Sequence, residues 1–211
     1  SYVCPTHNNL GSVKLVVATM VPSGKTIPSN ARTRADVLDP RGVQVPDIRD
    51  RDEKVFTGNV DLKKLEQLIE KGNVALVGMQ AVADGQHPFS LENLRAVHAL
   101  CSRHGLRLVL DGSRGVENAW YIQRHEVGQA DLSIADIVKR IAKTASIFQI
   151  DGAQDAKCNT GGLLATDNPD DYEKVMNEVV VYEGLHTYGG MAGRTMEVFA
   201  RGLREMCDED E

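Results

Sequence analysis

Two short, mainly apolar runs of strand length limit the possible folds more than any other part of the sequence. Val74–Met79 has the length of a strand and no polar alternation, which predicts a strand buried on both faces. Leu106–Leu110 is a second strand-length run, apolar except for Arg107, and it ends directly at Asp111. A helix-length amphipathic segment separates the two runs. Strands that alternate with helices predict an α/β fold whose mostly parallel sheet is covered by helices on both faces.

The same alternation continues along most of the chain. Asp61 and Ser90 are expected helix N-caps, because each precedes an amphipathic segment. Further strands are expected over 146–150 and 161–165. Helices are expected over 10–20, 61–69, 90–105, 114–126, 133–143 and 170–181. No repeat or linker interrupts the pattern, so residues 1–211 are expected to form one large-domain-like unit.

Composition excludes several classes of function. The 211 residues carry a net charge of −6, and no basic stretch indicates a nucleic-acid-binding face. No apolar run approaches the roughly 20 residues that a membrane-spanning helix needs. The four cysteines are scattered without a Cys-x-x-Cys pair, which favours a reducing, cytoplasmic location.

The segment that follows the second apolar run is the first candidate site. Asp111 ends the expected strand, and Ser113 and Arg114 open the next helix. Polar residues at the carboxyl ends of parallel strands are where ligands usually bind, and a carboxylate there can hold a pyridinium nitrogen. On residue types alone, the simpler interpretation is that Asp111 caps the helix and Arg114 is paired on its first turn.

Several motifs resemble those of the aromatic amino acid β-eliminating lyases, the family of tyrosine phenol-lyase and tryptophanase. The resemblance runs in the same order over nearly the whole chain, and its segments are Cys4–His7, Gly58–Leu65, Gly85–Val97, Asp111–Ile122 and Val179–Glu197. It implies a three-layer α/β/α domain of the aspartate-aminotransferase type, with pyridoxal phosphate as the family cofactor. Asp111, Ser113 and Arg114 match positions that hold this cofactor, and Arg194 matches an arginine that contacts the substrate.

The resemblance also implies an oligomer or a partner protein and a small, amino-acid-like ligand. Relative to the family, the N-terminal arm and most of the C-terminal small domain are expected to be absent from these 211 residues.

The chain departs from the family at the residues that anchor the cofactor. The family segment Ser-Gly-Lys-Lys-Asp, which contains the Schiff-base lysine, aligns with Asp151–Asp155, so that Ala153 and Gln154 take the two lysine positions. An amide nitrogen cannot form a Schiff base, because its lone pair is delocalised. Asp151 replaces the serine and would repel a phosphate.

Other cofactor contacts are changed as well. The family phosphate segment Gln-Gly-Arg-Gly reads Asn8-Asn9-Leu10-Gly11 here, so its arginine is lost. Ala81 replaces an asparagine that contacts the pyridine hydroxyl, and no aromatic residue for ring stacking is found within Asn30–Arg34. We therefore expect a divergent homologue without standard cofactor anchoring, which has either altered chemistry or a binding role.

Four alternatives remain open at this point. Lys157 could carry the cofactor, although odd spacing along a strand would place it opposite Gln154. A partner subunit could supply a lysine. The pairs Cys4–His7 and Asp84–His87 have zinc-like spacing, but two potential ligands are too few for a zinc site. Cys158 could be a nucleophile, but a buried, inert thiol is the more common case.

Overall fold

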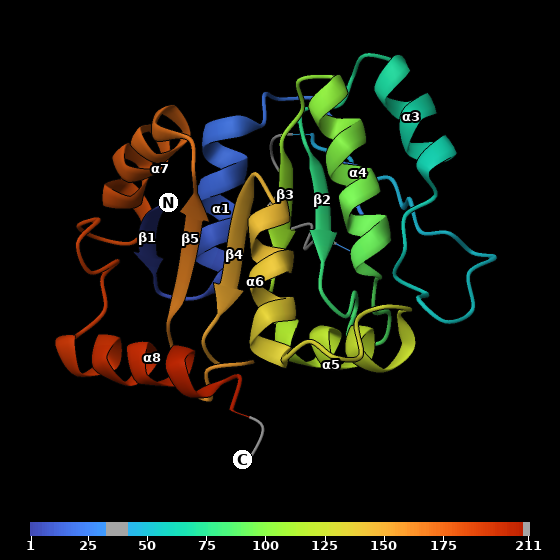
Figure 1. Cartoon of the computed structure of the whole chain (residues 1–211). Coiled ribbons are helices and arrows are strands. Elements are labelled where there is room, and N and C mark those ends of the chain that lie inside the picture. Colours follow the sequence, from blue (N-terminus) through green and yellow to red (C-terminus); the bar gives the residue numbers. More distant parts are fainter. Residues whose placement is uncertain (33–41, 209–211) are drawn as a thin grey trace.

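The computed structural model describes residues 1–32 and 42–208. Within them, one mixed sheet contains five strands in the order β1-β5-β4-β3-β2. Their bounds are β1 Tyr2–Thr6, β2 Val77–Gln80, β3 Leu108–Asp111, β4 Ile147–Asp151 and β5 Gly162–Thr166. β2, β3 and β4 pair in parallel, whereas β5 is antiparallel to both β4 and β1. Four strands therefore share one direction, and β5 alone is reversed (Figure 1).

Helices cover both faces of the sheet. Their bounds are α1 Asn9–Met20, α3 Leu62–Glu70, α4 Leu91–Arg103, α5 Gly115–His125, α6 Ile134–Thr144, α7 Pro169–Tyr182 and α8 Gly193–Glu205. The N-caps Asp61, Ser90 and Ser133 each accept a backbone N–H with their side-chain oxygen. The expected caps at Asp61 and Ser90 are thus confirmed.

Two buried clusters, one on each side of the sheet, make this a three-layer structure. On one side, Met79 and Leu110 pack with apolar residues of α3 to α6. On the other side, Val109 and Ile147 pack with α1 and α7. Because neighbouring residues of β3 enter opposite clusters, its uninterrupted apolar sequence is explained by burial on both faces. The expected layered α/β fold is confirmed (Figure 1).

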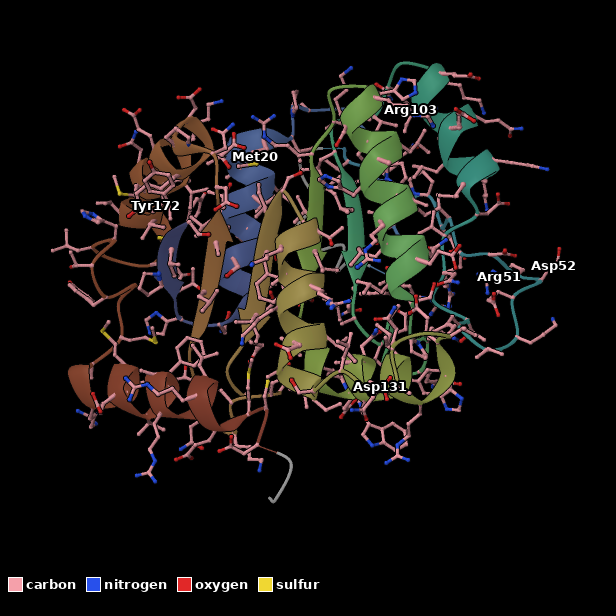
Figure 2. The ribbon with its side chains drawn as sticks, in the orientation of Figure 1. Met20, Arg51, Asp52, Arg103, Asp131 and Tyr172 are labelled. Carbon is pink, nitrogen blue, oxygen red and sulfur yellow. The ribbon has the colours of Figure 1, made fainter. Side chains whose placement is uncertain are left out.

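The outer faces of these layers are polar or exposed. Tyr172 of α7 stacks on Tyr2 of the edge strand β1, with ring centroids 5.0 Å apart. Figure 2 shows Tyr172 on the side of the molecule opposite Arg51 and Asp52, which project from the connection before α3. On the described residues, no helix is long and apolar enough to cross a membrane.

The sequence pattern did not reveal β1 and α8. β1 contributes Cys4 and Thr6 to the interior, while Tyr2 and Val3 stay exposed, so its apolar signal is short. α8 is anchored mainly by Phe199, its one buried residue. It lies close against the 152–158 turn, since a Cβ on Gly202 would meet the Ala156 carbonyl oxygen at 2.1 Å.

Candidate functional site

A cavity of about 280 Å³ lies between α1 and the strands β2 and β3. It reaches the edge of the sheet at which β2, β3 and β4 end, the lower edge in Figure 1. Its walls are mainly apolar, and its polar groups come chiefly from the strand ends and the start of α1. The apolar lining is Leu10, Val13, Val16, Val17, Ile27, Leu76, Met79 and Val109, and the main polar lining is Asn9, Gln80, Asp111, Gln149 and Asp151.

Asp111 is held at the end of β3 by uncharged donors. Its Oδ2 accepts from Asn9 Nδ2 at 2.7 Å and from Gln80 Nε2 at 3.1 Å. Its Oδ1 accepts from the Ser113 backbone N–H at 3.0 Å. Burial raises the pKa of Asp111, and these donors oppose that rise. Most of the hydrogen-bonding capacity of this carboxylate is therefore already used within the chain.

Asn9 has its orientation fixed by Asp111. An ionised carboxylate only accepts hydrogen bonds, so the amide nitrogen of Asn9 must face it. The amide oxygen, Oδ1, then points elsewhere, and it is buried without a hydrogen-bond partner among the described residues. A buried acceptor without a hydrogen-bond partner is costly, so this oxygen has an unmet need for a donor.

Asp151 occupies the N-terminal end of α1. Its Oδ2 accepts from the Asn9 backbone N–H at 3.2 Å, and its Oδ1 accepts from the Ala153 N–H at 2.8 Å. The Asp151 N–H in turn donates to Ser113 Oγ at 3.0 Å. A helix N-terminus favours an anion because its free N–H groups and dipole are positive. Here the chain supplies that anion itself.

A second carboxylate lies beside the first turn of α1. Glu183 Oε2 accepts from the His7 backbone N–H at 2.7 Å, and its side chain is only 9% exposed. A Cβ added to Gly11 would meet Glu183 Oε1 at 2.1 Å, so this carboxylate lies directly on the helix. The start of α1 is therefore enclosed by two acids of its own chain.

The other sequence-predicted site residues do not line this cavity with their side chains. Ser113 is buried and connects the segment to Asp151 through its hydroxyl. Arg114 adopts a left-handed conformation, with φ of 65°, and its guanidinium donates to Glu117 and to the Gly85 carbonyl. Pairing of Arg114 on the first turn of α5 is what the simpler sequence interpretation predicted. Its other half was wrong: Asp111 does not cap α5, whose Gly115 N–H donates to Asp155.

Neither Arg194 nor Lys157 lines the cavity that contains Asp111. Arg194 is exposed in the first turn of α8. Lys157 is exposed, has a φ of 51°, and lines a separate cavity of about 150 Å³ with residues of α8. The structure thus groups Asp111 with Asn9, Gln80 and Asp151 rather than with Arg194 or Lys157.

The substituted cofactor positions are also located. Ala153 and Gln154 are exposed in the turn that follows β4. Ala81 is fully buried behind the strand ends, and its N–H donates to the Asp111 carbonyl oxygen. Of the segment expected to lack a stacking aromatic, Asn30 to Arg32 are described, whereas residues 33 and 34 lie outside the described residues.

The zinc and thiol alternatives receive no support from the geometry. Among the described residues, no group of three potential metal ligands is found. His87 Nδ1 lies 2.9 Å from Thr57 Oγ1, and Asp84 accepts from the Arg32 N–H. Cys158 is buried, its thiol donates to the Thr160 carbonyl, and burial raises its pKa, which disfavours the reactive thiolate.

Sequence reasoning missed the structural roles of Asn9, Gln80, Glu183 and Asp155. Gln80 follows an apolar run just as Asp111 does, and that position could have identified it. Asp155 accepts from the Gly115 N–H at 2.9 Å and so occupies the start of α5. Burial raises the pKa of Asp155 to about 6. Its contact spans 40 residues, and no local pattern could have revealed it.

Comparison with known proteins agrees with this architecture. Residues 24–206 match the family model described as beta-eliminating lyase. A tyrosine phenol-lyase of Nostoc punctiforme is 38% identical over 99% of this chain and 48% of its own length. A tryptophanase of Hyphomonas neptunium is 34% identical over 100% of this chain and 49% of its own length. The chain spans about half the length of these relatives.

Solved structures support the fold class. A PLP-bound putative aminotransferase from Clostridium difficile 630 superposes with a TM-score of 0.66 over 98% of this chain and 51% of its own length, at 10% identity. A complex of SepCysS with the SepCysE N-terminal domain gives a TM-score of 0.69 over 98% of this chain and 53% of the matched chain, at 15% identity. The aminotransferase-like fold expected from the sequence is confirmed.

Proposed function

Because the chain belongs to the beta-eliminating lyase family, we propose that it is a divergent member that does not anchor pyridoxal phosphate on a lysine and instead binds a small, amino-acid-like molecule. The observation that carries this proposal is the Asp151 carboxylate on the N-terminal end of α1. The proposal concerns the cavity that Asp111 and Asp151 share with Asn9.

The phosphate of the family cofactor does not fit the described residues. A phosphate dianion needs free N–H groups, a helix N-terminus or fixed cations. The Asn9 backbone N–H already donates to Asp151, and Leu10 replaces the arginine of the family. Glu183 adds a further negative charge beside Gly11. A phosphate placed here would face repulsion and would have to displace an internal anion.

The carboxylate that would bind the pyridine ring of the cofactor is likewise already hydrogen-bonded within the chain. Asp111 Oδ2, which would accept a pyridinium N–H, already accepts from both Asn9 and Gln80. The described lining of the cavity contains no lysine, and Ala153 and Gln154 take the positions at which the family has two. These three departures concern the phosphate, the ring and the covalent bond, and they support loss of the standard anchor.

The test is a titration of the protein with pyridoxal phosphate, followed by visible absorbance, borohydride reduction and mass spectrometry of the peptides. We expect no stoichiometric adduct on the wild-type protein. The positive control is the double variant Asp151→Ser with Gln154→Lys, which restores a neutral helix end and an amine. An adduct on this variant alone would support the proposal.

A stoichiometric adduct on wild-type Lys157 would overturn the proposal and favour a pyridoxal-phosphate lyase with a relocated lysine. The same holds for an adduct on a lysine of a partner chain. Lys157→Ala is the matched variant for the first case. Because Lys157 is exposed and borders a different cavity, we expect this substitution to leave ligand binding near Asp111 unchanged.

We further propose that the protein acts as a homo-oligomer or with a partner protein, in the cytoplasm. Exposed apolar side chains at the end of α7 support association. All four cysteines are free thiols, and Cys4, Cys101 and Cys158 are buried, which supports a reducing compartment.

A further inference from the structure

We propose that the cavity between α1 and β2–β3 selects a small organic ammonium ion, with a protonated amine at its polar end and an apolar body along α1. This inference rests on the proposed function, because it names the ligand class for the same cavity. The group proposed to bind at the polar end is an amine cation, whereas the family cofactor carries a phosphate anion.

Three side-chain amides at the polar end direct an N–H to acceptors of the protein itself, and one amide oxygen there is unpaired within the described part of the chain. Asn9 Nδ2 and Gln80 Nε2 both donate to Asp111, and Gln149 Nε2 donates to the Ser12 carbonyl. Asn9 Oδ1 is buried and unpaired among the described residues. The partial negative charge of this oxygen adds to that of the Asp111 and Asp151 carboxylates, and it favours a cation over an anion at this end.

The charges near this end favour a cation. Asp111 and Asp151 line the cavity, and Asn9 links them by donating its side-chain N–H to one and its backbone N–H to the other. Among the described lining residues, the one cationic side chain is that of Arg32, which is exposed. An ammonium group at this end would therefore lie in the negative field of two carboxylates, without displacing a basic residue.

The remaining walls suit an apolar body. Val13, Val16 and Val17 of α1 face Ile27, Leu76 and Val109 across the cavity. Leu10 extends this apolar wall up to the polar end. The cavity volume of about 280 Å³ is close to the lower limit of typical small-molecule sites, about 300 Å³. A body of one ring or a short branched chain is the appropriate size.

Three probes of one shape test this inference by calorimetry: phenethylamine as the cation, 2-phenylethanol as the neutral analogue and phenylacetate as the anion. We expect phenethylamine to bind at least about tenfold more tightly than the neutral analogue, and phenylacetate to bind most weakly. Equal binding of the three probes, or a preference for phenylacetate, would overturn the inference.

Two variants locate the ammonium group. Leu10→Arg places a cation beside the polar end and should weaken phenethylamine binding at least about tenfold, whereas Val127→Arg, at an exposed site outside the cavity, should not. Asp151→Asn keeps the shape of the helix cap without its charge and should also weaken phenethylamine binding. Unchanged affinity in both folded charge variants would place the amine elsewhere and refute the assignment.

The two proposals fail in distinguishable ways. A lysine adduct with pyridoxal phosphate would overturn the proposed function whatever the amine result. Loss of the ammonium preference with no such adduct would leave the proposed loss of anchoring intact and refute only the ligand class. Circular dichroism of each variant verifies that the fold is retained.

Discussion

Asp155 is the buried carboxyl whose ionisation should make the stability of this domain depend on pH. Burial raises its pKa from 3.8 to about 6, so the folded state holds a proton that the unfolded state releases. Stability therefore falls as the pH rises from about 4 through 6, by about 3 kcal/mol for a shift of about two units. The stability of the Asp155→Asn variant relative to wild type should therefore increase as the pH rises through this range.

Urea unfolding of both proteins between pH 4 and pH 7 measures this difference. Asp131→Asn, at an exposed position, is the control for the loss of one negative charge. A stability difference between wild type and Asp155→Asn that is constant across the range would contradict the assignment.

Asp171 is the residue whose loss should most directly weaken the attachment of α7. It is buried, and Arg107 donates to both of its oxygens, with Nη2 at 2.6 Å from Oδ1. Because the Arg107 side chain is 38% exposed, water can solvate it once its partner is removed. We expect Asp171→Ala to cost roughly 1–3 kcal/mol in the free energy of unfolding.

Asp170→Ala is the matched control for Asp171, because Asp170 lies in the same helical turn and is exposed. Equal losses from the two substitutions would show that the helix dipole, and not the Arg107 pair, is responsible.

At the level of elements, the start of α1 should bind phosphate once its internal anion is removed. Asp151→Ser frees the Asn9 N–H, and Leu10→Arg adds a cation beside it. The double variant should show a rise in melting temperature with inorganic phosphate at millimolar concentration, and wild type should show none. Asp52→Arg, at an exposed site far from α1, controls for the same change in net charge. An equal response of wild type would contradict the occupied-helix interpretation.

The contact of α8 with the 152–158 turn depends on Gly202. An added methyl group would meet the Ala156 carbonyl oxygen at 2.1 Å, and a backbone atom cannot move away cheaply. Gly202→Ala should therefore destabilise the domain by about 1–3 kcal/mol, despite the better helix propensity of alanine. Gly193→Ala, on the same helix with no atom within 4 Å, should be neutral or stabilising. Thermal unfolding of both variants distinguishes strain from propensity.

Elements with strong periodicity were predictable, and those fixed by distant contacts were not. The apolar run at β3 is buried on both faces, as its sequence predicted. β2 is buried on one face only, because Gly78 and Gln80 on its other face border the cavity. The reversal of β5 could not be read from the sequence, because only its pairing with β4 and β1 defines its direction. α8 was missed because Phe199 is the one residue it buries, and its packing depends on Gly202 against a turn 46 positions earlier.

For the molecule as a whole, only part of the candidate site could be predicted from the sequence. Asp111 could be located from its place at a strand end. The loss of the two family lysines, replaced by Ala153 and Gln154, could be recognised from the family alignment. The side chains that now contact Asp111 and the start of α1 could not be predicted, because Asn9 contacts Asp111 across 102 residues and Asp151 across 142. Substitutions show what a site has lost, but the new partners of each group depend on three-dimensional packing.

The whole chain should also associate in solution. Val180, Val181, Tyr182, Leu185 and Tyr188 are exposed around the end of α7, and Val181 is 71% exposed. Contiguous exposed apolar side chains of this kind mark association surfaces, and a second copy of the chain is the occupant that we expect. Light scattering of the wild-type protein should give a mass above that of one 23.1 kDa chain.

Val181→Glu places a charge within this apolar group and should shift the mass toward the monomer. Val127→Glu is the matched control, because Val127 is 98% exposed on the connection between α5 and α6. A wild-type monomer at all concentrations would contradict the prediction, and so would equal effects of the two substitutions. Since a glutamate at either site changes the net charge equally, a difference in mass between the two folded variants locates the surface on which the copies meet.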